Sequence, residues 1–278
     1  MQADVHHAQT IDTARPSWGV RCAAAWMVVI ALLALAAPSL PIDDPARIDL
    51  AARNAPPGAG HWLGTDALGR DLLARVIHGA RVSLLVGLVA PAIGLALGGA
   101  IGLLAGFRRG WLDAIVGVMV DALLAFPALI LALIVSVYVG RGVDSMIATL
   151  TVLSVPACAR VARSAALATS QLGYVEAARA GGASEMRILW RHVLPNAMPR
   201  LATFGLLLVA LMIVVEGALG FLGLGVAPPA PSWGGMIAEG RAQLEDAPQV
   251  CLAPAAALFA TVLSLNVLGE LRRARTRD

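Results

Sequence analysis

Two acidic residues, Asp121 and Glu216, lie inside long apolar runs of this sequence and are its first candidates for chemistry. An ionised carboxylate in hydrocarbon is costly, so such a residue is expected to have a partner, to face water or to bind a ligand. We expect Asp121 either to pair with Arg108 or Arg163 or to line a path through the membrane. For Glu216 the alternatives are a structural hydrogen bond and a place on such a path.

Patterns typical of catalysis or of metal binding are missing from the sequence. It has no GxxxxGK[ST] loop to hold phosphates, so it has no such route to ATP hydrolysis, and we predict that it is not an enzyme. The five histidines are scattered, and the three cysteines lie in or beside apolar runs. The sequence therefore predicts no catalytic residue, no metal site, no cofactor and no disulfide within this chain.

The longest charged interruption between apolar segments is residues 170–200, SQLGYVEAARAGGASEMRILWRHVLPNAMPR. Ser170 is expected to cap a short helix that ends at the glycine pair containing Gly182, and Ser184 to cap a second helix. Pro195 should end or kink that second helix. A helix pair that is apolar on one side, beside a membrane yet too charged to enter it, is suited to a groove on another protein.

The composition identifies the environment of these residues. Of 278 residues, 58% are apolar and 14% are charged, whereas soluble domains carry about 25% charged residues. All 21 basic residues are arginine, spread through loops, so the formal charge of +3 does not indicate nucleic acid binding. The sequence predicts an all-α, polytopic protein surrounded by membrane lipid.

Six apolar runs are long enough to cross a hydrocarbon core of about 30 Å, which takes about 20 residues of helix. The predicted spans are residues 22–40, 82–107, 114–139, 144–164, 201–222 and 250–268. The remaining segments are an N-terminal tail (1–21), an outer loop (41–81) and a loop between spans four and five (165–200), with 22–278 forming one membrane domain. Within the outer loop, the spacing of apolar residues from Asp71 to Arg81 predicts an amphipathic helix on the membrane surface.

The arginines predict the orientation of these spans. Most of them lie on the side that holds both termini and residues 165–200. Because Lys and Arg near span ends favour the cytoplasmic side, we expect both termini and this loop in the cytoplasm.

Residues 170–200 resemble the cytoplasmic coupling loop of ABC importer permeases, whose pattern is Glu-Ala-Ala, three residues, Gly, nine residues and Ile-x-Leu-Pro. The matching residues are Glu176, Ala177, Ala178, Gly182, Leu194 and Pro195. His192 stands at the Ile position, and RHVLPN is similar to the version in peptide-transporting members. Residues 61–87 and 221–237 resemble the dipeptide, oligopeptide and nickel permease group, specifically its second or "C" subunit.

The resemblance implies a transmembrane subunit of an ATP-driven importer of dipeptides or oligopeptides in the plasma membrane of a prokaryote. It implies as partners a homologous permease in a heterodimer, an extracytoplasmic substrate-binding protein, and two ATPase subunits or domains that bind ATP and Mg²⁺. The residues implied in coupling to the ATPases are Glu176, Ala177, Ala178, Arg179, Gly182, Arg187, Leu194 and Pro195. Arg179 and Arg187 would pair with acidic groups of an ATPase or would simply face solvent.

Two alternatives remain open at this point. One keeps the machinery but changes the cargo to nickel or a nickel chelate. The other is a self-sufficient channel or secondary transporter, although such proteins usually carry intramembrane ionisable pairs or inverted repeats, and this sequence has few candidates for the first and no clear repeat.

Overall fold

The computed structural model describes residues 18–275, with side chains for 18–271. Most of the predicted tail and the side chains of the C-terminal arginines lie outside this part of the chain. The long helices are α1 (Trp18–Ala36), α2 (Leu72–Arg108), α3 (Gly110–Ala125), α4 (Ala128–Val139), α5 (Val143–Thr169), α8 (Leu194–Phe221) and α10 (Gln249–Arg275). The short elements are α6 (Gly173–Ala180), α7 (Glu185–Ile188), the π-helical turn η3 (Leu189–Val193), α9 (Trp233–Gly240) and the 3-10 turns η1 (Ala37–Ser39), η2 (Leu50–Ala52) and η4 (Arg241–Gln243).

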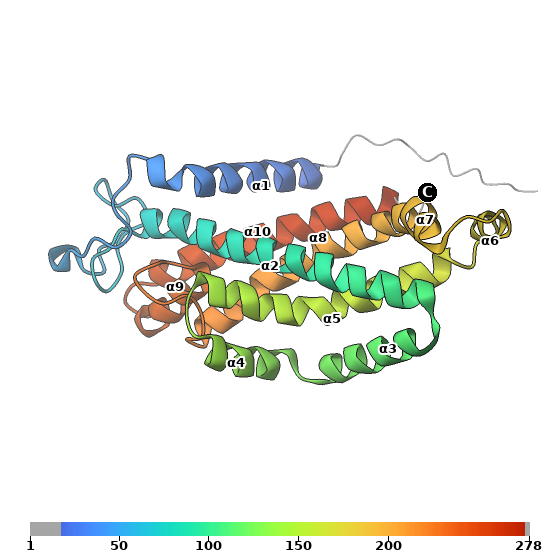
Figure 1. Cartoon of the computed structure of the whole chain (residues 1–278). Coiled ribbons are helices and arrows are strands. Elements are labelled where there is room, and N and C mark those ends of the chain that lie inside the picture. Colours follow the sequence, from blue (N-terminus) through green and yellow to red (C-terminus); the bar gives the residue numbers. More distant parts are fainter. Residues whose placement is uncertain (1–17, 276–278) are drawn as a thin grey trace, which may run out of the picture.

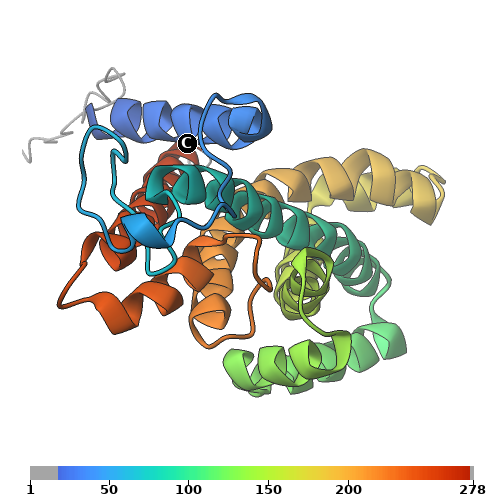
Figure 2. The ribbon, with the colours of Figure 1, turned by 90° about the vertical axis from the view of Figure 1, so that its left-hand side faces the viewer.

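The long helices run side by side in one bundle (Figure 1). Five helical runs are long and apolar enough to cross a membrane, and the pair α3 and α4 makes a sixth if it is counted as one bent span. Helix α1 lies on the opposite side of the bundle from α3 and α4 (Figures 1 and 2). Among the described residues there is no strand. The predicted all-α, polytopic fold with about six spans is confirmed.

The closest helix pair, α2 and α5, meets along a row of glycines spaced four residues apart. Gly94, Gly98, Gly102 and Gly106 lie on one face of α2, and a Cβ added at any of them would come within 3.0 Å of an atom of α5. Small residues at this spacing let two backbones approach where no water is available to drive apolar surfaces together. The glycines therefore hold the centre of the bundle together.

The first correction to the predicted spans concerns the start of α2. Asp71 caps the helix, because its Oδ1 accepts a hydrogen bond from the Ala74 N–H at 2.7 Å. From there the helix continues unbroken to Arg108, so the predicted surface helix from Asp71 to Arg81 is the beginning of the second span. Its apolar face is buried against protein, including Trp233 of α9, rather than lying on lipid.

The second correction concerns the predicted span 114–139. It is broken into α3 and α4, whose axes differ by 93°. Phe126 ends α3 in an extended conformation, with φ −72° and ψ 134°, and Pro127 follows it. The proline ring disfavours the helical conformation at the preceding residue and supplies no N–H, so a break is favoured at this point.

The third correction concerns the loop predicted at 165–200. Ser170 does not cap a helix start: it ends α5, which reaches Thr169, and α6 begins only at Gly173. Pro195 lies in the first turn of α8, where its missing N–H is tolerated, so it does not end the second helix. Instead α7, η3 and α8 form one apolar helical run from Glu185 to Phe221.

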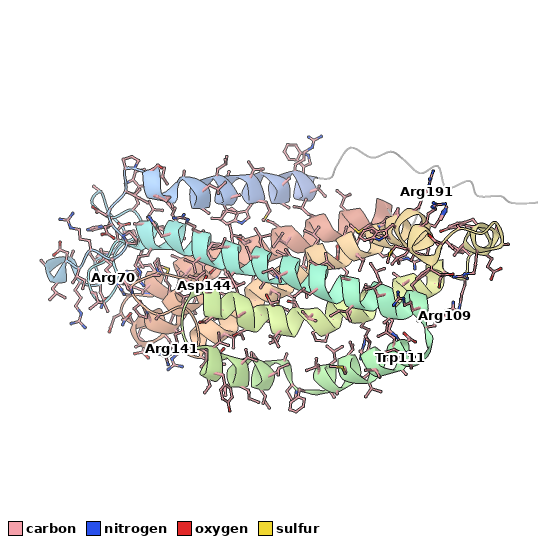
Figure 3. All side chains as sticks on the ribbon, in the orientation of Figure 1. Arg70, Arg109, Trp111, Arg141, Asp144 and Arg191 are labelled. Carbon is pink, nitrogen blue, oxygen red and sulfur yellow. The ribbon has the colours of Figure 1, made fainter. Side chains whose placement is uncertain are left out.

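Charged side chains mark the two ends of the bundle. Arg70, Arg141 and Asp144 lie at the end that carries α9, whereas Arg109 and Arg191 lie at the end that carries α6 and α7 (Figure 3). Below, these are called the α9 end and the α6 end.

Candidate functional site

The predicted coupling loop forms a compact corner at the α6 end of the bundle. Helix α6 ends at Gly181, and Gly182 follows with φ +80°, a conformation that glycine adopts far more easily than other residues. The N–H of Ala183 donates to the Ala178 carbonyl at 3.1 Å, and the N–H of Gly182 donates to the Arg179 carbonyl at 3.1 Å. This pair of bonds is a Schellman motif, which stops α6 and sets the direction of α7.

Side chains on both sides of the corner reinforce its angle. Ser184 caps α7 as predicted, because its Oγ accepts from the Arg187 N–H at 3.4 Å. The Arg179 guanidinium donates two hydrogen bonds to the Glu185 carboxylate, at 2.8 and 3.2 Å, which joins the end of α6 to the start of α7. Arg179 therefore has a partner within the chain, whereas the sequence suggested a partner in another protein or solvent.

One face of the corner is fixed to the bundle. Val175, Ile188 and Val193 are fully buried, and they pack in one cluster with Phe107 of α2 and Ala166 of α5. Burial of three branched side chains makes α6, α7 and η3 move with the neighbouring ends of α2 and α5 rather than as a free loop.

The opposite face of the corner is exposed and apolar in part. Leu172, Tyr174, Met186, Trp190 and Met198 are each between 44% and 62% exposed. The Trp190 Nε1 atom lies 3.1 Å from the Met186 sulfur, and the ring centroids of Tyr174 and His192 lie 6.0 Å apart, so each of these two pairs of side chains is in contact. We call this set the corner surface.

The predicted coupling residues lie on or around this surface. Glu176, Ala177, Gly182, Arg187 and Pro195 are exposed, and Ala178 and Leu194 are partly buried. The described part of the chain offers Glu176 and Arg187 no ion-pair partner, so both charges remain available to another molecule. The structure thus brings the predicted residues together at one end of the bundle.

The two acids in apolar helices have different environments, and Asp121 does not have the partner expected for it. Asp121 of α3 pairs with Arg160 of α5, and both side chains are exposed. Arg163, which was one of the expected partners, instead binds Asp113, eight residues before Asp121 in α3. Asp121 itself lies on the surface of the isolated chain, in the first half of the broken span.

Glu216 is fully buried in α8 and makes a structural hydrogen bond. Its Oε2 accepts from the Ser83 hydroxyl of α2 at 2.9 Å, and the same hydroxyl oxygen accepts from the Trp233 N–H of α9 at 3.2 Å. The Trp233 indole N–H in turn donates to the Val76 carbonyl at 3.0 Å. In this structure Glu216 joins three helices, α8, α2 and α9.

A buried charge cluster at the α9 end was not recognised from the sequence. Arg70 Nε donates to Asp66 at 2.6 Å, and Arg70 Nη2 and Arg75 Nη2 donate to Glu239 at 2.8 and 2.9 Å. Arg75 also binds Asp66 and is only 3% exposed. Two arginines and two carboxylates thus connect α2 and the loop before it to α9.

The electrostatics of this cluster favour the charged form of Asp66. Burial would raise the pKa of the Asp66 carboxyl, but hydrogen bonds from the backbone N–H groups of Arg70 and Leu68, together with the Arg75 charge, lower it below the usual value. The closely spaced acids and arginines of residues 66–75 were a signal for local pairing. The distant partner, Glu239, was not recognisable because it lies 164 residues from Arg75.

Curated relatives match nearly the whole chain. A glutathione transport system permease protein of Pectobacterium atrosepticum is 38% identical over 250 residues, which cover 89% of this chain and 83% of that protein. The protein of the same name in Escherichia coli is 40% identical over 249 residues, covering 89% and 82% of the two chains. A Brucella suis protein, named provisionally as a peptide transport system permease protein, is 39% identical over 244 residues, covering 88% and 82%.

A solved structure has the same fold. The inward-facing MetNI methionine ABC transporter in its selenomethionine-soaked crystal form aligns with a TM-score of 0.62 and 23% identity, covering 72% of this chain and 95% of the matched chain. In addition, residues 98–275 match the family described as binding-protein-dependent transport system inner membrane component. These matches confirm the resemblance to ABC importer permeases of the peptide group. The chain therefore belongs to the family of binding-protein-dependent transport system inner membrane components.

Proposed function

We propose that this chain is one of two homologous transmembrane subunits in an ATP-driven importer of peptides, and that it forms half of the translocation path. Support for the cargo comes from relatives 38% to 40% identical, which are named for glutathione, a tripeptide, and for peptide transport. The family supports a binding protein as a partner, since its members are components of binding-protein-dependent systems. This membership argues against a self-sufficient channel.

The observation that carries the proposed coupling role is the corner surface. Large side chains such as Tyr174, Met186 and Trp190 are exposed at the α6 end beside the unpaired charges of Glu176 and Arg187. Exposed aromatic and methionine side chains next to available charges are the features of a protein interface. We assign this surface to an ATPase subunit, which would bind the ATP and Mg²⁺ that this chain has no loop to hold.

The same geometry suggests how force would enter the bundle. A push on α6 or α7 reaches α8 directly, because residues 185–221 form one helical run, and it reaches α2 and α5 through Val175 and Ile188. Closure of the ATPases would thus tilt the inner ends of three spans together. A change between two packed arrangements of helices is the type of transition that converts such a shift into opening of a path.

Placement of the corner surface on an ATPase requires the α6 end of the bundle to be cytoplasmic, as the arginine distribution also predicts. In the plasma membrane of a prokaryote, both termini would then lie in the cytoplasm and α9 would lie at the outer surface. There the binding protein would deliver its peptide.

The test is peptide uptake by the assembled system in membrane vesicles. The chain is expressed with the other components of its own transport system, and uptake of radiolabelled dialanine, trialanine and glutathione is measured with and without ATP. We expect at least one of these peptides to enter only when ATP, the ATPases and the binding protein are all present. ATP-independent uptake by the purified chain alone, or no uptake of any peptide by the complete system, would contradict the proposal.

A further inference from the structure

The ion pair between Asp121 and Arg160 lies at membrane depth, well along the bundle from its α6 end. Arg160 is nine residues from the inner end of α5 at Thr169, and Asp121 is eleven residues from the inner end of α3 at Gly110. At 1.5 Å per residue these positions are about 14 and 17 Å along the helices. Helix α5, with 27 residues, is about 40 Å long and extends beyond a hydrocarbon core about 30 Å thick, so the pair lies within the core, in the half toward the α6 end.

The pair is nonetheless open on the surface of the chain. The Arg160 side chain is 54% exposed and the Asp121 side chain 71% exposed, and every residue from 121 to 130 is exposed. Charged groups at this depth are avoided on a surface that faces lipid. The α3 and α5 face must therefore meet water or protein in the membrane.

The opposite side of the bundle has the character expected of a lipid-facing surface. Val28 and Leu32 of α1 and Phe259 of α10 are between 58% and 65% exposed. Helix α1 and the α3–α4 pair lie on opposite sides of the bundle, as the end view shows (Figure 2). The α3–α4 side also exposes large apolar side chains, among them Val118, Phe126 and Val137, so what sets it apart from the apolar α1 side is the exposed Asp121–Arg160 pair.

A neighbouring ion pair shows what a structural pair looks like in the same seam. Arg163 donates two hydrogen bonds to Asp113, the second from Nη2 to Oδ2 at 2.8 Å, and the two side chains are 34% and 18% exposed. Arg160 makes one hydrogen bond, to Oδ1 of Asp121. Within the described residues, the Oδ2 of Asp121 and the remaining N–H groups of Arg160 have no partner in the chain.

We propose that Asp121 and Arg160 form a binding site for the charged ends of a zwitterionic peptide on its way through the membrane. The peptide's ammonium group binds Asp121 and its carboxylate binds Arg160, so one internal ion pair is exchanged for two pairs with the ligand. Because the site is neutral overall, it accepts a zwitterion without trapping a net charge. This inference rests on the proposed peptide cargo.

Accessibility to water tests the location of the site. Asp121→Cys is placed in a chain with Cys22→Ser, Cys158→Ala and Cys251→Ser, and the assembled complex is treated with a membrane-impermeant, cationic methanethiosulfonate, with and without ATP. The matched control is Leu32→Cys on the apolar side. Because a thiol reacts as the thiolate, which forms in water, we expect modification of Asp121→Cys at least about tenfold faster than the control in one of the two states. Equal, slow modification in both states would overturn the proposal.

Selectivity between peptide ends tests the ligand. The ratio of the uptake rates of trialanine and N-acetyl-trialanine is measured in the wild-type complex and in Asp121→Asn. The binding protein is the same in both complexes, so its own preference cancels when the two ratios are compared. If the carboxylate binds the ammonium group, the ratio should fall about tenfold in Asp121→Asn, as expected for loss of a charged hydrogen bond. Arg160→Gln should lower the corresponding ratio of trialanine to its C-terminal amide.

A merely structural ion pair predicts a different result. Loss of packing between α3 and α5, or loss of a contact with the partner permease, would slow both peptides equally and leave the ratios unchanged, and that result would overturn this inference. Asp144→Asn, at the outer end of α5, is the matched control and should keep the wild-type ratios. Failure of the wild-type complex to import any peptide would instead contradict the proposed function.

Discussion

Replacement of Gly182 tests whether the angle of the corner couples the chain to its motor. The backbone at Gly182 has φ +80°, and an added Cβ would meet no atom within 4 Å, so the entire cost within this chain is conformational. For alanine in the left-handed region this cost is about 1–2 kcal/mol. Such a change lowers the population of the native corner relative to alternatives by a factor of about 5 to 30.

The neighbouring glycine provides a matched control. Gly181 has φ −76°, and a Cβ there would lie 3.4 Å from the Ala177 carbonyl oxygen, close to an ordinary contact. We therefore expect Gly181→Ala to retain peptide uptake. Gly182→Ala should lower uptake several-fold, and Gly182→Val should lower it further, because a β-branched side chain is least compatible with positive φ. The bundle should still assemble in the membrane, since Gly182 is exposed and an added Cβ there would meet no atom of the bundle.

Asparagine at position 182 separates backbone strain from a steric clash with the ATPase. Asparagine is larger than alanine but adopts positive φ more readily. Strain predicts more uptake by Gly182→Asn than by Gly182→Ala, whereas a clash predicts the reverse. Uptake by Gly182→Ala equal to wild type, or Gly181→Ala as harmful as Gly182→Ala, would refute the reasoning.

Three further predictions concern packing, charge and topology. Gly102→Ala should destabilise the protein by about 1–3 kcal/mol, because the added Cβ would overlap the Ala159 backbone. Gly99→Ala should not destabilise it, because a Cβ at Gly99 would meet no atom within 4 Å. Thermal unfolding of both variants in detergent tests this difference. Because folding lowers the pKa of Asp66, the carboxylate's stabilising contribution is complete above the ordinary pKa of 3.8 and is lost as pH falls through the lower folded value. Asp66→Asn should remove this loss of stability in acid. Unfolding temperatures measured between about pH 2 and 6 compare the two proteins. A reporter fused after Arg277 should be cytoplasmic, with green fluorescent protein bright and alkaline phosphatase inactive.

Each of these has a result that contradicts it. Equal unfolding temperatures for Gly102→Ala and Gly99→Ala would mean that α2 and α5 can separate without cost. A wild-type acid response that persists in Asp66→Asn would assign the pH dependence to other groups. Alkaline phosphatase activity after Arg277 would place the corner surface outside the cell.

Features governed by local chemistry were predictable from the sequence. Gly182 follows the end of α6 with positive φ, and Ser184 caps α7, because each depends only on residue type and spacing. The break of the third span was less predictable. Pro127 and Pro91 both lie inside apolar runs, yet α2 continues through Pro91 while the chain bends at Pro127. Neighbouring helices decide which outcome occurs.

Features that depend on distant partners were not predictable from the sequence. The carboxylate of Asp121 pairs with Arg160 rather than Arg163, because a second acid, Asp113, occupies Arg163. Sequence spacing cannot rank two arginines on another helix. For the same reason the interpretation of Glu216 remained divided until the structure placed Ser83 beside it.

The π-helical turn at Leu189–Val193 holds one extra residue where α7 joins α8. Such a turn fits about one residue more than an α-helical turn into the same rotation. Removal of a single residue within it would restore regular winding and leave Ile188 facing the bundle, whereas removal of a residue from the α-helical part of α8 would rotate everything before it by about 100°. Natural variants of this permease should therefore vary freely in length in the loop before α2 but tolerate a missing residue between the corner and Glu216 only within this turn.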